Sequence, residues 1–337
     1  MEQRPIRLGL LAAARITSAA VVDPARVVDG IEVTALGARS LGRAEETAEA
    51  WGVATAYGSY EELIADPDVD AVYIATPAAL HRHWTLAALG AGKDVLCEKP
   101  LASNAAEARE MVEAADTAGR ILMEAFHWRY HPIVAQLESI LASGRIGSLR
   151  HVHGVFDLPE GHIGHGDIRW DLALGGGALM DLGCYPAQWL RWVVGSEPRV
   201  ASAEAVCPVP DVDGQMVAQL AWDDGTTGTI QCSMIETGPA EVRLEVVGAD
   251  AILHVANPLA PQRGARIEVR EPDGRVDELA VDGLDTTTYQ HQLTAFVEAV
   301  RSRVPPITSG HDSIATMELI DACYTAAGLA PRPSFAA

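Results

Sequence analysis

The sequence predicts a two-domain α/β protein, in which a parallel sheet with helices on both faces precedes an α+β domain with a large, mostly antiparallel sheet. Short apolar runs alternate with helical patterns over the first third of the chain, as in the repeated β-α units that build parallel sheets. From residue 199 to residue 270, extended segments instead follow one another through turns. A chain of 337 residues also accommodates two domains comfortably.

The first domain is predicted to span residues 1–125. Ser59 and Glu62 have the spacing of a capping box, and Asn104 is expected to cap the helix that follows it. A first helix is expected to begin near Arg15. The other expected elements are strands over 6–11, 32–38, 54–57, 71–75, 95–97 and 121–125, and helices over 42–51, 78–89 and 105–118.

The second domain is predicted to span residues 126–337. A polar loop rich in histidine and glycine precedes a helix expected over 178–194, and the last helix is a candidate to pack back on the first domain. Asp223-Asp224-Gly225 is expected to form a turn between two strands. The other expected elements are helices over 133–143, 288–303 and 312–328, and strands over 148–156, 217–222, 226–234 and 243–247.

Composition limits the partners and the compartment. The net charge of −21 argues against binding to nucleic acid or to an anionic membrane. Five cysteines without a C-x-x-C pair indicate thiols in a reducing compartment, so we expect a cytoplasmic protein. The apolar run at 8–14 faintly resembles a secretory signal, but its shortness favours a β-strand. No stretch approaches the ~20 apolar residues of a membrane-spanning helix.

The turn after the first strand has the position of the phosphate-binding loop in a Rossmann dinucleotide-binding domain. Ala12-Ala13-Ala14-Arg15-Ile16-Thr17 stands where G-x-G-x-x-G/A is expected, so all three glycine positions are substituted. Alanine is small enough for close approach to a pyrophosphate, but it does not readily adopt positive φ. The following helix can still present its N-terminal amides to phosphate. We therefore predict cofactor contacts at Ala12, Ala14, Arg15 and Ile16.

The end of the second strand predicts which dinucleotide binds. An acidic residue there would bind the ribose 2′-hydroxyl of NAD, but this chain has Arg39 and Ser40, with Arg43 one helical turn later. Arg39 can pair with a 2′-phosphate and stack on adenine, and Ser40 can add a hydroxyl. NADP is therefore predicted over NAD, which stays possible. A solvated arginine at a strand end is the alternative interpretation.

Two later strand ends carry further candidates, because ligands bind at the carboxyl ends of strands in open α/β sheets. Thr76 and Pro77 follow the fourth strand, and His81 is either a cofactor contact or a histidine on a helix face. Glu98-Lys99-Pro100 follows the fifth strand, and Glu98 and Lys99 are predicted to contact the cofactor. The proline biases Lys99 toward an extended conformation, and a cis bond would aim the ammonium into a cleft. Lys99 is thus a candidate donor to the cofactor or to a reacting oxygen, although the tripeptide alone also suits a surface turn.

The segment 174–186 combines three glycines with a helix that carries Asp181 and Tyr185. Residues four apart on a helix share a face, so the carboxylate and the phenol can meet one substrate. A nearby ammonium and an oxidised nicotinamide would both lower the phenol pKa from about 10. Tyr185 could then exchange a proton with a substrate hydroxyl. A flexible glycine turn with Tyr185 packed in the core is the alternative.

These segments and the order of the domains resemble the glucose–fructose oxidoreductase / inositol dehydrogenase (Gfo/Idh/MocA) family. The resemblance extends from Ile6 to about Gly328 and includes the segments 123–126 and 167–170. Many members carry histidine at the position of Tyr185. Tyrosine there is similar to the branch of dihydrodiol dehydrogenase and NADP-linked pyranose dehydrogenase.

The resemblance implies an NAD(P)-dependent oxidoreductase that acts on a hydroxyl or ketone carbon of a sugar, polyol or diol. Tyr185 would donate or accept the proton, Lys99 would polarise the substrate oxygen and tune Tyr185, and Asp181 would orient the substrate or the lysine. Contacts with the substrate are predicted for His127, Arg169 and Trp170. The histidines at 151–165 lie largely in a glycine-rich loop without a helical scaffold, so no metal site is expected.

Two other functions stay open. One is transient redox chemistry in a lyase or glycosidase, which would consume no cofactor. The other is a non-catalytic nucleotide-sensing protein, which only the substituted phosphate loop favours. An antiparallel sheet with helices on one face can pair its other face with another subunit, so a homodimer or homotetramer is expected.

Overall fold

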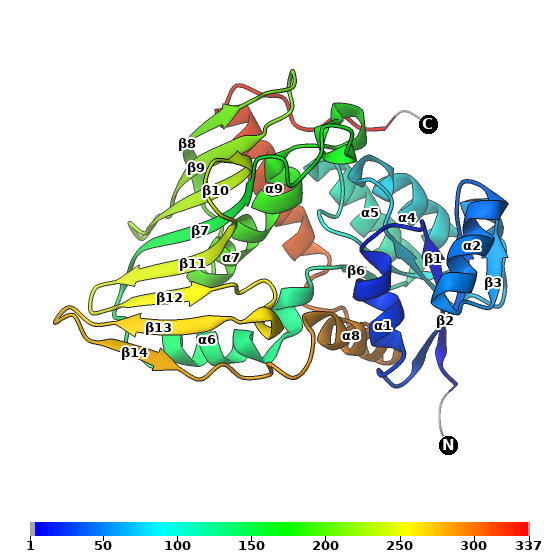
Figure 1. Cartoon of the computed structure of the whole chain (residues 1–337), viewed down its shortest axis with the longest axis horizontal. Helices are drawn as coiled ribbons and strands as arrows, with labels where there is room; N and C mark the ends of the chain where they lie inside the picture. Colours follow the sequence, from blue (N-terminus) through cyan, green and yellow to red (C-terminus); the bar gives the residue numbers. More distant parts are fainter. Residues whose placement is uncertain (1–3, 336–337) are drawn as a thin grey trace. The chain divides into compact units, whose positions relative to one another are not determined.

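The computed structural model describes residues 4–335, which divide into two compact units (Figure 1). Unit 1 contains the chain up to Tyr130 and again Tyr289–Ile314, whereas unit 2 contains His131–Thr288 and Ala315–Ser334. The helix after residue 288 therefore returns to unit 1, while the last helix lies mostly in unit 2. Each unit is built on its own sheet.

Unit 1 contains a six-stranded parallel sheet in the order β3-β2-β1-β4-β5-β6. The strand order reverses between β1 and β4, and the carboxyl ends of two such strands flank the usual ligand crevice. Every strand lies within about one residue of its predicted bounds. The strands are β1 (Ile6–Leu11), β2 (Ile31–Gly37), β3 (Thr55–Tyr57), β4 (Ala71–Ile74), β5 (Asp94–Cys97) and β6 (Leu122–Glu124).

Two helices of unit 1 begin with the predicted side-chain caps. The Ser59 hydroxyl accepts a hydrogen bond from the Glu62 amide (3.2 Å), and Asn104 Oδ1 accepts one from the Glu107 amide (3.1 Å). The helix expected near Arg15 begins instead at Ser18. The helices are η1 (Ser18–Val22, a π-helical turn), α1 (Asp23–Ala25), α2 (Leu41–Trp51), α3 (Tyr60–Ala65), η2 (Ala78–Leu80), α4 (His81–Gly90), α5 (Ala105–Ala118), η3 (His127–Tyr130) and α8 (Thr288–Ser302).

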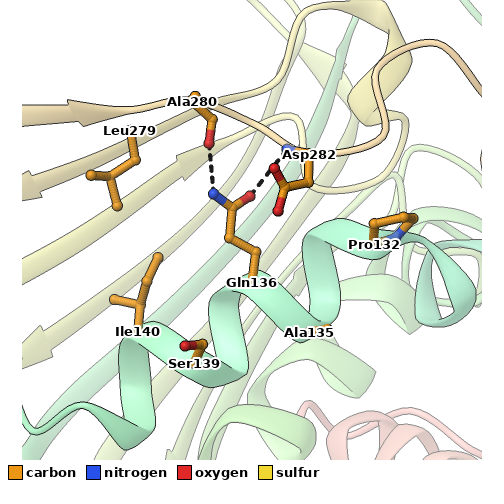
Figure 2. Close-up of a pocket in the computed structure, with 8 residues that line it drawn as sticks. All are labelled: Pro132, Ala135, Gln136, Ser139, Ile140, Leu279, Ala280 and Asp282. Carbon is orange, nitrogen blue, oxygen red and sulfur yellow. Dashed lines mark hydrogen bonds between the residues drawn. The ribbon is translucent and has the colours of Figure 1, made fainter.

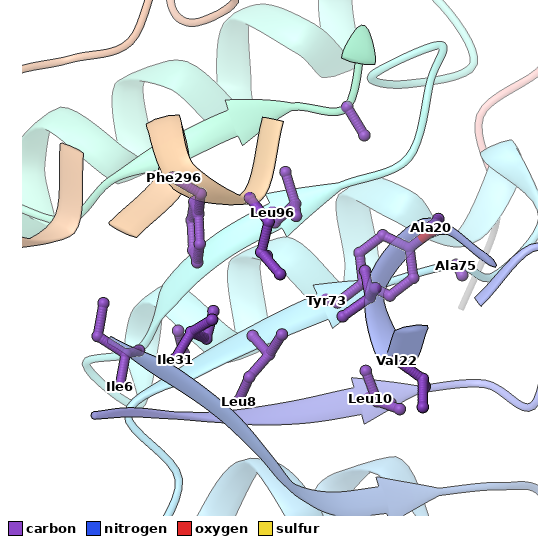
Figure 3. Packing of buried hydrophobic residues seen from close by; sticks show 14 of the residues in the cluster. Ile6, Leu8, Leu10, Ala20, Val22, Ile31, Tyr73, Ala75, Leu96 and Phe296 are labelled. Carbon is purple, nitrogen blue, oxygen red and sulfur yellow. The ribbon is translucent and has the colours of Figure 1, made fainter. Parts of the chain in front are cut away.

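The core of unit 1 joins its sheet to elements far apart in the sequence. Leu8 of β1 and Leu96 of β5 belong to one buried cluster, in which Phe296 of α8 is also fully buried (Figure 3). Successive residues of a strand face opposite sides of the sheet, so Gly9 faces the side opposite to Leu8, where it leaves room for α3. A Cβ at Gly9 would lie 2.6 Å from a methyl carbon of Leu63. Burial of these apolar side chains is the main force that holds α8 in unit 1.

Unit 2 contains an eight-stranded sheet in the order β14-β13-β12-β11-β7-β10-β9-β8. Neighbouring strands are antiparallel except β7 and β10, which are parallel, so the sheet is mostly antiparallel as predicted. The strands are β7 (Leu149–Pro159), β8 (Arg199–Val206), β9 (Gln215–Ala221), β10 (Thr227–Glu236), β11 (Glu241–Gly248), β12 (Ile252–Ala256), β13 (Arg266–Arg270) and β14 (Val276–Leu279).

The central helix of unit 2 packs directly on its sheet, because a Cβ at Gly154 of β7 would lie 2.8 Å from Pro186. The helical elements are α6 (Pro132–Ala142), η4 (Ile168–Trp170), η5 (Leu172–Leu174), η6 (Leu179–Gly183, a π-helical turn), α7 (Cys184–Val194), η7 (Pro261–Arg263) and α9 (His311–Ala326). Within residues 4–335, no helix combines the length and the apolar character that crossing a bilayer requires.

A pocket of unit 2 lies between α6 and the segment that follows β14 (Figure 2). The Gln136 side chain spans it, since its amide nitrogen donates to Ala280 O (2.6 Å) and its oxygen accepts from the Asp282 amide (3.2 Å). These bonds attach the chain after the edge strand to α6. None of the residues predicted to bind cofactor or substrate lines this pocket.

Candidate active site

The turn after β1 contains a residue with positive φ, which its alanine sequence made unexpected. Ala12 has φ +91°, although left-handed backbone costs an L-residue roughly 1–2 kcal/mol. Its amide donates to Gly37 O at the end of β2 (3.1 Å), which holds the turn against the neighbouring strand. Arg15 and Ile16 are exposed before η1 begins. The turn thus has the shape for which glycine is usually needed, but it is built from alanine.

The end of β2 places positive charge beside this turn. Arg39, Ser40 and Arg43 are all exposed, and Arg43 Nη2 donates to Ala13 O (3.3 Å). Burial raises the pKa of Tyr60, and the guanidinium groups of Arg39 and Arg43 oppose that rise because they lie near its hydroxyl. The two cations therefore share one edge of unit 1 with the turn after β1.

The turn that carries Lys99 is held by buried groups of unit 1. The Lys99-Pro100 bond is cis. Glu98 Oε1 accepts a hydrogen bond from the buried Tyr73 hydroxyl (2.6 Å), and Glu124 Oε1 accepts one from the Leu101 amide (2.8 Å). The first bond holds the Glu98 side chain and the second holds the Leu101 main chain, so both neighbours of the Lys99-Pro100 pair are anchored at the carboxyl end of β5.

His81 connects this turn to the end of β4. Its Nδ1 lies 3.0 Å from Pro100 O and its Nε2 lies 2.8 Å from Thr76 O, and the side chain is buried. Burial lowers the pKa of His81, and the two carbonyl oxygens oppose that effect. Both ring nitrogens are engaged by main-chain oxygens, so His81 supports the edge of the sheet and has no ring nitrogen left for a cofactor.

Thr76 differs from His81 in this respect. Its Oγ1 is buried and lacks a hydrogen-bond partner within residues 4–335. A buried hydroxyl without a partner in a native structure calls for an explanation, and a bound ligand is one. Thr76 lies at the end of β4, beside the point where the strand order reverses.

His127 packs on the ring of Tyr289, a contact that was not predicted from the sequence. The rings of His127 and Tyr289 have centroids 4.3 Å apart, and His127 is buried. Tyr289 stands at the start of α8, which returns to unit 1. Because more than a hundred residues separate the two rings, no spacing rule could have paired them.

The glycine run of unit 2 is packed against the segment before it. The Gly176 amide donates to Asp171 O and the Gly177 amide to Arg169 O, both at 2.9 Å. A Cβ at Gly176 would lie 2.6 Å from Arg169 O, and Gly177 has φ +137°. These glycines are required by close contact, which excludes the interpretation of a flexible turn.

The helix after the run begins with the π-helical turn η6 and continues as α7. Pro186 has no amide hydrogen, and a proline ring clashes with the carbonyl four residues earlier, which here belongs to Leu182. We attribute the wider turn to this proline. Asp181 lies in η6 and Tyr185 in α7, so the regular helix expected around both residues is interrupted between them. Such π-helical turns are frequent at functional sites.

Asp181 and Arg169 meet in unit 2. Arg169 Nε donates to Asp181 Oδ2 (2.5 Å), and Arg169 Nη1 donates to Asp167 Oδ1 (3.0 Å). Burial alone would lower the pKa of Arg169, but the two carboxylates raise it above its ordinary value. The sequence predicted Arg169 and Asp181 separately, as substrate contact and as orienting group, and the structure brings them together as an ion pair.

The two aromatic candidates of unit 2 are buried. Tyr185 is 5% exposed, and its ring lies beside those of Phe156 (5.9 Å) and Trp189 (6.3 Å). Trp170 donates its indole N–H to Ile163 O (3.3 Å). Both side chains are therefore packed among other side chains of unit 2.

The histidine-rich segment presents a different arrangement. His151 Nδ1 pairs with the Thr227 hydroxyl (2.8 Å) across the parallel strands β7 and β10. Among residues 4–335, no group of three or more histidine, cysteine, aspartate or glutamate residues has the arrangement of a metal site.

In each unit, the structure also identifies residues near the candidate groups that sequence reasoning missed. Tyr73 and Glu124 support the Lys99 turn, and Asp213, Tyr324 and Arg332 lie against the glycine run. In the sequence, Arg332 stands out only as an arginine within a mostly apolar segment near the C-terminus, and this pattern does not indicate a particular role.

Comparisons with known proteins agree with this fold. Residues 8–126 match the model of the oxidoreductase family with the NAD-binding Rossmann fold, and residues 134–254 match the GFO/IDH/MocA C-terminal domain. The chain is 34% identical to D-xylose 1-dehydrogenase (NADP(+)) 2 of Haloferax volcanii, over 95% of this chain and 96% of that one. It is 41% identical to mouse trans-1,2-dihydrobenzene-1,2-diol dehydrogenase over 62% of each chain.

A solved structure extends the similarity. The 3-ketoreductase KijD10 from Actinomadura kijaniata, in complex with NADP and TDP-benzene, superposes with a TM-score of 0.88 at 29% identity. The match covers 96% of this chain and 98% of that one. Together with the 34% identity over nearly the full length of the xylose dehydrogenase, these matches identify the chain as a member of the Gfo/Idh/MocA family of oxidoreductases.

Proposed function

We propose that this protein is an NADP-dependent oxidoreductase that transfers a hydride between the nicotinamide and a hydroxyl or ketone carbon of a sugar, polyol or diol. One observation carries the cofactor preference. Arg39 and Arg43 present exposed guanidinium groups at the end of β2, where an acidic residue would favour NAD. Relatives named as a NADP-linked xylose dehydrogenase and a dihydrodiol dehydrogenase support the substrate class.

The residues of unit 1 fit such a cofactor. Arg39, Ser40 and Arg43 would hold the 2′-phosphate, and the turn at Ala12–Ala14 would lie along the pyrophosphate with Arg15 and Ile16 at its end. The Thr76 hydroxyl, which has no partner within residues 4–335, would contact the middle of the cofactor together with Pro77. When bound, NADP would supply the hydride acceptor, and NADPH the hydride donor.

The protein's own groups would handle the proton and the substrate oxygen. Lys99 would donate a hydrogen bond to that oxygen and stabilise its developing negative charge. Tyr185 would give its proton to the oxygen in reduction and receive it in oxidation. Asp181, paired with Arg169, would orient a substrate hydroxyl, while His127 and Trp170 would line the substrate's path.

Cofactor preference is tested by titrating NADPH and NADH into the protein and following nicotinamide fluorescence. We expect tighter binding of NADPH, and we expect Arg39→Asp to weaken NADPH binding at least tenfold while NADH binding changes little. Glu45→Gln, on an exposed position of α2, is a matched surface control. Tighter binding of NADH to the wild-type protein would contradict the proposal.

The reaction is tested with a panel of aldoses, inositols, diols and ketosugars in the presence of NADP or NADPH. In Lys99→Met and Tyr185→Phe, we expect kcat to fall by about 10²–10⁴-fold with unchanged NADPH affinity. Tyr57→Phe removes a hydroxyl bonded to Asp66 and serves as the control for loss of a phenol. An unchanged kcat in Tyr185→Phe would remove this residue from the proton transfer.

The same assay separates the two alternative functions. A transient-redox lyase or glycosidase would convert its substrate without net consumption of NADP. A nucleotide-sensing protein would bind NADPH with saturation but convert no member of the panel. The Asp181–Arg169 pair favours catalysis over nucleotide sensing, and net consumption of NADP separates a dehydrogenase from a transient-redox lyase or glycosidase.

We also propose that the protein is a cytoplasmic homodimer or homotetramer. All five cysteines are free thiols, as a reducing compartment allows. In the sheet of unit 2, His153, Glu245 and His254 follow one another across β7, β11 and β12 and are only partly buried. This polar surface suits pairing with a second copy. Sedimentation velocity over a range of protein concentrations tests it, and a monomer at micromolar concentration would contradict it.

A further inference from the structure

A charged cluster lies in the interior of unit 2, behind the glycine run. Asp213 stands in the loop between β8 and β9, Tyr324 on α9, and Arg332 in the segment after α9. Asp213 and Tyr324 are 0% exposed and Arg332 is 1% exposed. The Arg332 guanidinium pairs with Asp213 and lies over the Tyr324 ring, 3.9 Å from its centroid. The Tyr324 hydroxyl donates to Asp213 Oδ1 (2.9 Å).

The cluster bonds directly to the backbone that leads into η6. Asp213 Oδ2 accepts a hydrogen bond from the Leu179 amide (2.7 Å), and Asp213 O accepts one from the Ala178 amide (2.7 Å). The first amides of a helix lack partners within the helix, so Asp213 acts as a cap supplied from a distant loop. Arg332 Nε donates to Gly176 O (2.6 Å), and its Nη1 donates to Asp211 O (2.8 Å). Every nitrogen of this guanidinium therefore has a defined acceptor.

The fit between the cluster and the run leaves no free space. A Cβ at Gly177 would lie 2.6 Å from Arg332 Nη2 and would also collide with Asp213 Oδ1. The backbone at Gly177 therefore approaches the ion pair more closely than any residue with a side chain could. A displacement of Arg332 or Asp213 would move the start of η6 with it.

Stability alone is a poor reason for such a cluster. Removing two charges from water is expensive, and well-packed apolar residues often replace a buried ion pair without loss of stability. Burial raises the pKa of Asp213 to about 6, so the cost of burying its charge outweighs the attraction of Arg332. What the pair does provide is a fixed direction for each of its hydrogen bonds, which apolar side chains cannot supply.

We infer that Asp213 and Arg332 are positioning residues, which set the start of the helical segment and thereby the places of Asp181 and Tyr185. This inference rests on the proposed function of those two side chains. Catalysis depends steeply on such placement, because a shift of about 1 Å lowers the rate by about 10²-fold. The carrying observation is that the Asp213 carboxylate accepts from Leu179, the Asp213 main-chain oxygen accepts from Ala178, and the Arg332 guanidinium donates to Gly176, directly before Asp181.

The experiment uses Arg332→Lys, Arg332→Ala and Asp213→Asn in the full-length protein. Lysine keeps the charge but cannot bond to Gly176, Asp211 and Asp213 at once in the planar geometry of arginine. Arg145→Ala is the matched control for a lost ion pair in unit 2, where Arg145 pairs with Glu271. Leu253→Ala, at a buried position of β12, is the control for lost stability.

Two measurements are made below the unfolding temperature of every variant: steady-state kinetics, and hydrogen exchange of the peptide covering 176–183. In Arg332→Lys we expect kcat to fall at least 30-fold with NADPH affinity within twofold, and exchange to accelerate in 176–183 but not in β11 or β12. Arg332→Ala should lose more kcat than Arg332→Lys, and Asp213→Asn should accelerate hydrogen exchange in the same peptide. Both controls should keep kcat within threefold.

Each outcome decides the inference. If Arg332→Lys and Arg332→Ala keep kcat within threefold, or if Leu253→Ala loses as much kcat as they do, the cluster has no positioning role in catalysis. If exchange in 176–183 is unchanged, the cluster does not set this segment at all. If the wild-type protein converts no substrate of the panel, the proposed function fails, while exchange still reports whether the cluster orders the segment.

Discussion

Two tight turns precede helices, one in each unit, and they are built from different residues. One follows β1 at Ala12–Ala14 and leads into η1, and the other at 175–177 leads into η6. Both contain positive φ, at Ala12 (+91°) in the first and at Gly175 (+79°) and Gly177 (+137°) in the second. Each also leads into a π-helical turn with a proline shortly after it, Pro24 and Pro186. Yet the first turn contains only alanine and the second contains only glycine.

The difference follows from what surrounds each turn. Ala12 is half-buried, and its Cβ finds room, so only the backbone conformation carries a cost of roughly 1–2 kcal/mol. At Gly177 a Cβ would enter the space of the Asp213–Arg332 pair. Glycine in a motif therefore reports two separate requirements, a backbone conformation and a close contact, and alanine can meet the first at moderate cost but not the second.

The largest effect is expected for Gly177→Ala, which adds a clash to an unfavourable conformation. We expect a loss of more than about 4 kcal/mol in the free energy of unfolding, or failure to fold. Gly195→Ala is the matched control, since Gly195 has φ +74° but nothing within 4 Å of an added Cβ. We expect it to cost about 1–2 kcal/mol in chemical denaturation. If the two variants lose the same free energy of unfolding, the close contact at Gly177 adds nothing to the cost of the backbone conformation.

A second prediction concerns the buried charge of Asp213 behind the glycine turn. Burial raises the pKa of Asp213 to about 6, above the ordinary value near 3.9. The folded state therefore holds this proton more tightly than the unfolded state. Its contribution to stability is complete below about pH 4 and is lost as the pH rises through 6.

This effect is isolated by comparing wild type with Asp213→Asn in urea denaturation at several pH values. From pH 4 to pH 7, we expect the free energy of unfolding of the wild type, relative to the variant, to fall by about 2–3 kcal/mol. A difference that stays flat over this range would show that the Arg332 partner compensates fully for burial.

The smallest effect is expected at the other turn. Ala12→Gly should relieve the backbone strain at φ +91° but should also increase the entropy of the unfolded chain. We expect a net gain of about 0.5–1 kcal/mol in thermal or chemical unfolding. Ala13→Gly, at a neighbouring position without positive φ, should instead lose about 0.5–1 kcal/mol. A loss in both variants would mean that Ala12 is not strained.

Much of the fold followed from local patterns. The strands of unit 1 lie within about one residue of their predicted bounds, because buried parallel strands have apolar runs that stand out from the helices between them. The caps at Ser59 and Asn104 were equally predictable, since each depends on residues three apart. The first helix was expected too early, because the turn at Ala12 and the exposed residues after it delay its start to Ser18.

The candidate site was predicted less completely. Arg169 and Asp181 were both named, but their ion pair depends on how the glycine run lies against Arg169. His81 was named for the cofactor, whereas its ring nitrogens lie against Thr76 O and Pro100 O. Such contacts join elements that a linear pattern does not relate.

The sequence by itself determined the order of the elements, the lysine at the end of β5, the arginines at the end of β2 and the glycine run, because each is a local property of a few neighbouring residues. Only the tertiary structure decided that α8 completes the core of unit 1 and that Arg332 and Asp213 meet behind Gly177. The physical reason is that hydrophobic burial and charge pairing act between residues brought close in space. Their separation along the chain, 119 residues for that last pair, carries no periodic signal.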